Sequence, residues 1–196
     1  MVRRAWVAMS MMAALARADL QAPSPAAAVG PCADPLAFDC YPLVNEDGVV
    51  AVPRPSLAPT NDFTLHEVEL IPSTRSRAPE RLSGEAIAPR IRGGGFRKFP
   101  PPILTGSYGV GNRMTRLQAQ AAGWTFRVEG GALIAIRDGK TRWRRRLHPG
   151  GFECYQLTPW VVKLWLEPAR GVLVIAAWGD KCMSGTPSWE VISLAP

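Results

Sequence analysis

The stretch "WTFRVEGGALIAIRDGKTRWRRRL", residues 124–147, decides the fold class. Apolar and polar side chains alternate in its first run, which is typical of a β-strand with one buried face. The apolar residues of this run share one face: Trp124, Phe126 and Val128. Two turns, Gly130-Gly131 and Asp138-Gly139, separate it from the runs "ALIAIR" and "KTRWRRRL". Glycine adopts the positive φ that tight hairpin turns need, so the stretch predicts three antiparallel strands.

Further runs of the same kind lie on both sides of this stretch. Downstream, three apolar runs follow, which bring the expected C-terminal strands to six: "WVVKLWL", "GVLVIAAW" and "SWEVISL". Upstream, "YPLVNEDGVVAVPRP" carries a hairpin signal at Asp47-Gly48, and "FTLHEVELI" at 63–71 has the pattern of another strand. The sequence therefore predicts a mostly β domain, an antiparallel meander with a sandwich-like or small propeller-like architecture.

One segment has the signals of a helix, and another has the composition of a loop. In "GNRMTRLQAQAAGW", Asn112 can cap a helix and Gly123 can end it, with apolar residues at helical spacing between them. We expect one short helix there. Residues 72–112 are rich in arginine, proline and glycine, and no helical or strand period persists through "RIRGGGFRKFPPP". This composition predicts a long basic Pro/Gly-rich loop.

The hairpin "ALIAIRDGKTRWRRRL" resembles a blade hairpin of secreted quinoprotein or WD40-like β-propellers, and "YPLVNEDGVVAV" resembles one more faintly. The likeness rests on a strand, an Asp-Gly type of turn and a tryptophan. A propeller blade repeats about every 40 residues, and no such period recurs along this chain. The resemblance implies a meander architecture and no particular function.

The N-terminal residues have the three-part layout of a secretory signal. Arg3 and Arg4 precede an apolar run that ends at Leu15, and Ala16-Arg17-Ala18 supplies the small residues of a cleavage site. The run is shorter than the roughly 20 residues that span a membrane. We therefore expect a cleaved signal peptide and a secreted or periplasmic protein, exported by the general route or, because of the paired arginines, by the twin-arginine route.

The domain organisation follows from this reading of the N-terminus. The expected segments are a signal peptide at 1–18, a Pro/Ala linker at 19–31 and a single β-rich domain at 32–196. Removing the signal would remove three arginines and no acidic residue, which would lower the net charge from +7 to +4. No other apolar stretch is long enough for a transmembrane span, so none is expected.

The chain has four cysteines, and an even number in an exported protein favours disulfides. Four cysteines allow three pairings, of which we expect the local one, Cys32–Cys40 and Cys154–Cys182. The alternative is a reactive Cys154 with His148 as its base and Asp180 nearby. These are the residue types of a nucleophilic centre, but their spacing does not enforce its geometry.

The segment "KTRWRRRLH" is the most basic of the expected strands. As a strand it puts three arginines on one face and Trp143, Arg145 and Leu147 on the core face. The candidate ligand-binding residues are Arg142, Arg144, Arg146 and His148. A row of guanidinium groups can bind repeated anions, so the expected partner is an anionic envelope polymer, lipid headgroups or an acidic protein, and not nucleic acid. The alternative is pairing of the row with Glu67 or Glu69.

No catalytic or metal-binding motif stands out in the chain. The two histidines, His66 and His148, lack the spacing of metal ligands, and no cofactor or metal is expected. Four tryptophans in or beside the C-terminal strands are expected in the core: Trp160, Trp165, Trp178 and Trp189. The leading hypothesis is a non-catalytic binding or scaffolding domain of the cell envelope or secreted fraction, and the alternative is a hydrolase with an unrecognised active site.

Overall fold

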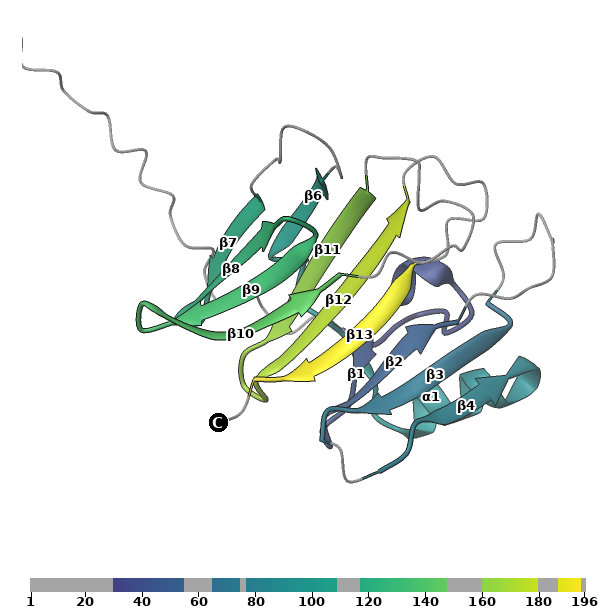
Figure 1. Cartoon of the computed structure of the whole chain (residues 1–196). Helices are drawn as coiled ribbons and strands as arrows, with labels where there is room; N and C mark the ends of the chain where they lie inside the picture. The colour runs from purple at the N-terminus through teal and green to yellow at the C-terminus, as the bar shows by residue number, and fades with distance from the viewer. Residues whose placement is uncertain are drawn as a thin grey trace, which may run out of the picture.

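The computed structural model describes residues 30–54, 65–74, 77–108, 117–147, 160–179 and 187–194. These residues form three antiparallel sheets with one α-helix, α1 (Ile87–Gly93), and two 3₁₀ turns, η1 (Phe38–Cys40) and η2 (Gly84–Ala86). The sheets are stacked, as Figure 1 shows. The expected mostly β, antiparallel fold is confirmed, and one short helix is present, although not in the segment where it was expected.

Four consecutive strands make the sheet at one end of the stack, here called the meander sheet. They are β7 (Leu117–Ala121), β8 (Trp124–Glu129), β9 (Ala132–Arg137) and β10 (Lys140–Arg146). Each connection is a two-residue turn with positive φ at both positions: Ala122-Gly123, Gly130-Gly131 and Asp138-Gly139. Such turns match the twist of paired strands. The three strands expected in residues 124–147 are therefore confirmed.

The middle sheet has the order β13-β12-β11-β6. Its strands are β6 (Leu104–Tyr108), β11 (Trp160–Glu167), β12 (Val172–Gly179) and β13 (Ser188–Ser193). All six expected C-terminal strands are present, but they are split between two sheets, with β6 added beside β11. The unbroken apolar run of β12 reflects burial on both faces, because a strand of a middle layer has no solvent side.

The third sheet, here called the N-terminal sheet, has the order β4-β3-β2-β1-β5. Its strands are β1 (Leu43–Val44), β2 (Val49–Pro53), β3 (Glu67–Pro72), β4 (Glu80–Ser83) and β5 (Arg97–Lys98). The hairpin expected at Asp47-Gly48 joins β1 to β2, and Gly48 has a φ of 75°.

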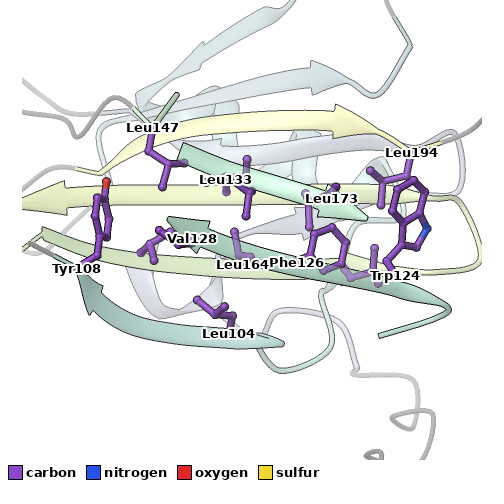
Figure 2. Packing of buried hydrophobic residues seen from close by; sticks show 14 residues of the cluster. Leu104, Tyr108, Trp124, Phe126, Val128, Leu133, Leu147, Leu164, Leu173 and Leu194 are labelled. Atoms are coloured by element: carbon purple, nitrogen blue, oxygen red, sulfur yellow. The ribbon is translucent and has the colours of Figure 1, made fainter. Parts of the chain in front are cut away.

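Three hydrophobic clusters hold the layers together. Figure 2 shows the cluster between the meander and middle sheets, where Phe126 and Leu133 meet Leu164 and Leu173. A second cluster joins the middle sheet to the N-terminal sheet, and a third lies under α1. Arg170, in the β11–β12 turn, donates a 3.2 Å hydrogen bond to the carbonyl oxygen of Glu46, which adds a polar tie between the middle and N-terminal sheets.

The helix expected over Asn112–Gly123 is wrong where the structure describes that segment. Residues 117–121 form the strand β7, and Gly123 belongs to a hairpin turn. In "LQAQA" apolar and polar residues alternate, with Leu117, Ala119 and Ala121 packed against the core. Pairing with β8 outweighs the helix propensity of alanine and glutamine here.

The expected loop over residues 72–112 is also wrong for the most part, because it contains β4, η2, α1, β5 and β6. Helix α1 buries Ile87 and Ile91, one turn apart, against the N-terminal sheet. The triple glycine ends this helix and turns the chain toward Phe96. A Cβ atom on Gly94 would lie 2.7 Å from the Phe96 ring and 2.8 Å from the Arg90 carbonyl oxygen, so glycine fits this close approach.

The disulfide expected between Cys32 and Cys40 is confirmed, with a Cα–Cα distance of 5.7 Å. The expected partners Cys154 and Cys182 lie outside the described residues. Pro31, at the end of the expected linker, forms a bridge with Arg97 of β5, which adds the chain before Cys32 to the N-terminal sheet. In the described part of the chain no helix is both long and apolar enough to cross a membrane.

Candidate ligand-binding face

The solvent side of the meander sheet, here called the outer face, is built from three rows of side chains that the strand register aligns. The first row is Gln118, Arg127, Ile134 and Arg144; the second is Gln120, Thr125, Ile136 and Thr141; the third is Glu129, Ala132 and Arg146. The alternate residues of the same strands pack into the core. In Figure 1 this sheet is the end layer of the stack, so no other described sheet covers its outer face, although Ala132 of the third row is buried.

Strand β10 divides its arginines between the two sides of the sheet. Arg144 and Arg146 are exposed and lie on the outer face. Arg145 lies on the opposite side with Trp143, as expected, and pairs with Glu190 of β13. Leu147 is buried in the same core. Two adjacent arginines thus have different surroundings: Arg144 lies on the outer face, and Arg145 pairs with the middle sheet on the opposite side.

The expected row of three arginines is interrupted at its first member. The register pairs Thr141 with Ile136 and Trp143 with Ala135, so Arg142 is the extra residue of a β-bulge and stands outside the regular alternation. Its guanidinium lies 3.3 Å from the carboxylate of Asp138 in the preceding turn. The row expected on the outer face is therefore shortened to Arg144 and Arg146.

Arg127 of β8 supplies a third guanidinium to the outer face. It lies in the same row as Arg144, on the other side of Ile134. Its Nε atom donates a 3.0 Å hydrogen bond to the side-chain oxygen of Gln118, which holds the guanidinium over the sheet. The alternation in "WTFRV" puts Arg127 on the face opposite Trp124, Phe126 and Val128, but a single strand gives no sign that pairing brings it into the same row as Arg144.

The charge of the outer face is mainly positive. Within the described part of the chain, no carboxylate forms an ion pair with Arg144 or Arg146. Glu129 is the one acidic residue in the three rows, and it has a partner of its own. Three guanidiniums and one carboxylate leave a net charge of +2 on the face, which attracts anions.

The alternative in which the β10 arginines pair with Glu67 or Glu69 is wrong. Glu69 pairs with Arg54 at 3.0 Å and with Arg81 at 3.9 Å, all within or beside the N-terminal sheet. Glu67 is exposed on β3 of the same sheet. The middle sheet separates both glutamates from the meander sheet, so neither glutamate pairs with an outer arginine.

The expected aromatic core is present where the structure describes it. Trp165 is buried and stacks on Trp189, with 5.7 Å between ring centroids. Trp178 is half-buried, and the ammonium group of Lys163 lies 5.6 Å from the centre of its ring. These rings belong to the interface of the middle and N-terminal sheets, and the three outer-face rows contain no aromatic residue.

The remaining candidates for chemistry do not form a site in the described residues. His148, Cys154 and Asp180 lie outside them, and the described part holds no group of three or more His, Cys, Asp or Glu residues that fits a metal ion. Burial raises the pKa of Tyr41 and of Tyr108 above the ordinary value, which marks both phenols as neutral core groups.

A second surface feature is a hollow of about 540 Å³ at the end of α1. Ile91, Phe96 and Cys32 line it, with Arg92 and Arg97 beside them. Its walls are mostly apolar, and it opens widely to solvent. The hollow holds no cluster of titratable groups comparable with the three guanidiniums of the outer face.

The chain was compared with known protein families, curated proteins and solved structures. No family model, curated protein or solved structure matches the chain.

Proposed function

We propose that the protein is an exported, non-catalytic binding domain that holds a polyanionic ligand on the outer face of its meander sheet. The observation that carries the proposal is the set of three exposed guanidiniums on one open sheet face: Arg127, Arg144 and Arg146. Guanidinium groups bind carboxylates and phosphates through paired hydrogen bonds, and their charge persists at any physiological pH.

The rest of the fold supports binding rather than catalysis. The three guanidiniums of the outer face are exposed on one side of a sheet, whereas catalytic groups work in sites that exclude water. The Cys32–Cys40 disulfide and the N-terminal layout of Arg3, Arg4 and Leu15 favour an oxidising compartment outside the cytoplasm. Anionic polymers of the cell envelope or the secreted fraction are the natural partners of a basic protein there.

Export is tested separately from binding. We expect protein recovered from its native host to begin at Asp19, after cleavage behind Ala18. Intact-mass measurement gives the answer directly. Retention of residues 1–18 in the exported protein would remove this part of the proposal.

Binding is tested with the full chain and long-chain polyphosphate, a flexible polyanion without sugar rings or hydroxyl groups along its chain. We expect affinity to fall steeply with salt, because the screening length shrinks from about 10 Å at 0.1 M to about 3 Å at 1 M. The triple change Arg127→Ser, Arg144→Ser and Arg146→Ser should weaken binding by about tenfold or more while leaving the fold intact, since each lost contact involves a charged group.

A matched control removes the same charge elsewhere. Arg77, Arg81 and Arg92 are exposed and lie in or near the N-terminal sheet and α1. Changing all three to serine lowers the net charge by the same amount, and we expect polyphosphate binding to stay within about threefold of the parent. Equal losses in both triple variants would show attraction to net charge alone and would contradict an outer-face site.

A further inference from the structure

The outer face carries a second kind of recognition group beside its arginines. Its second row presents an amide and two hydroxyls, from Gln120, Thr125 and Thr141, around the half-buried Ile136. This row runs parallel to the row of Arg127 and Arg144, two residues further along the strands, a spacing of about 6.8 Å. The face is thus cationic along one line and hydrogen-bonding along the next.

We infer that the ligand of the outer face is an acidic polysaccharide that crosses the strands with its acid groups over the arginine row and its hydroxyls over the amide–hydroxyl row. This inference rests on the proposed polyanion-binding function. Strands lie about 4.8 Å apart, so Arg127 and Arg144, two strands apart, are separated by about 9.6 Å in this direction. A chain of uronic-acid residues presents carboxylates and hydroxyls together along its length, which matches both rows.

The size of the face favours an extended chain over a folded protein partner. Four strands of about five residues cover an area of about 300 Å². A stable protein–protein interface buries about 800 Å² on each partner, so the outer face is too small for one. A polymer chain needs only a strip of surface, and its repeated groups allow neighbouring contacts to add.

The composition of the face argues against a lipid surface. Proteins that bind anionic membranes through charge use clusters of about 4–8 basic residues, and many also place tryptophan or tyrosine at the interface. The outer face has three arginines opposed by Glu129, and its rows contain no aromatic residue. Phe38, the exposed large hydrophobic residue of the described part, lies in η1, beside the N-terminal sheet.

The test compares two probes on variants of the full chain. Polygalacturonate carries carboxylates and hydroxyls along its chain, whereas polyphosphate carries anionic oxygens and no hydroxyls along its chain. The triple change Gln120→Ala, Thr125→Val and Thr141→Val keeps the charge, and its two valines keep the β-branched side chains that suit a strand. We expect it to raise the Kd for polygalacturonate about tenfold, through lost hydrogen bonds, and to leave the Kd for polyphosphate within about twofold. Thr105→Val, on β6 of the middle sheet, is the matched control and should change neither.

Each outcome separates the ligand class from the proposed function. Weaker binding of polygalacturonate after its carboxylates are methyl-esterified, together with sensitivity to the amide–hydroxyl row, would support the inference. Polyphosphate binding through the arginines, with polygalacturonate unbound or insensitive to Gln120, Thr125 and Thr141, would overturn the polysaccharide and keep the polyanion function. Preferential binding to phosphatidylglycerol vesicles would likewise overturn it in favour of a lipid surface. Binding of none of these probes would overturn both.

Discussion

Arg145 of β10 and Glu190 of β13 form an ion pair between the edge strands of two different sheets. On the other side of the same sandwich β6 lies against β7, where the side chain of Leu117 covers Gly106. The two contacts close both sides of the core between the meander and middle sheets. The ion pair also joins one arginine of "RRR" to the middle sheet, whereas no carboxylate of the described residues pairs with Arg144 or Arg146.

The first prediction concerns this ion pair. Arg145→Ser should destabilise the fold by about 1 kcal/mol, because the less exposed Glu190 loses its counter-charge, and a half-exposed arginine limits the effect. A double-mutant cycle with Glu190→Gln, measured by urea unfolding, isolates the pair. Additive effects of the two changes would show that the contact contributes nothing to stability.

The second prediction concerns the β7–β8 turn. Ala122 has a φ of 50°, which is strained for a residue with a Cβ atom. Ala122→Gly should raise the free energy of unfolding by about 0.5–1 kcal/mol, since glycine reaches this conformation without strain. Ala119→Gly, in the middle of β7, is the control and should lower it by a similar amount. A destabilised Ala122→Gly variant would contradict the positive φ.

The third prediction concerns the close approach of β6 and β7. A Cβ atom on Gly106 would lie 2.7 Å from a methyl carbon of Leu117. Gly106→Ala should therefore lower stability by about 1–2 kcal/mol through overpacking. Leu117→Ala removes the obstructing methyl groups, so the double variant should lose less than the sum of the two single changes. Thermal unfolding of the four proteins tests this coupling.

The fourth prediction concerns pH. Burial raises the pKa values of Tyr41 and Tyr108 above 10.0, so both phenols stay protonated in the folded protein when they ionise in the unfolded chain. Their contribution is fully present below pH 10 and is lost as the pH rises above it, with a slope of about 1.4 kcal/mol per pH unit for each tyrosine. Urea unfolding between pH 8 and pH 11 should show the loss, and Tyr108→Phe should reduce the slope. An unchanged slope would contradict the assignment.

The strands that could be predicted from the sequence are those bounded by clear turn signals. Gly130-Gly131 and Asp138-Gly139 fixed the ends of β9, and the alternation in "WTFRV" identified β8. Strand β7 was missed because its alanines and glutamines also suit a helix, and pairing with β8 decides between the two. Helix α1 was missed because Pro89 and the glycines that follow are residue types typical of loops. Proline is nevertheless tolerated in the first turn of a helix.

The candidate site was predictable only in part, for a similar reason. Alternation along one strand is a local property, so Arg144 and Arg146 could be assigned to one face and Arg145 to the other. The position of Arg127 opposite Arg144 depends on the register of three strands, and the displacement of Arg142 depends on a bulge. Neither leaves a signal in the sequence of a single strand.

The measurement that tests the central claim most directly compares Arg144→Ser with Arg145→Ser in the full chain. The two changes remove the same charge from adjacent residues of β10, but Arg144 lies on the outer face, whereas Arg145 lies on the opposite side and pairs with Glu190. We predict that Arg144→Ser weakens polyphosphate binding severalfold and leaves urea unfolding within about 0.5 kcal/mol of the parent, whereas Arg145→Ser leaves binding intact and lowers stability. Equal losses of binding in the two variants, or a loss confined to Arg145→Ser, would contradict a ligand site on the outer face.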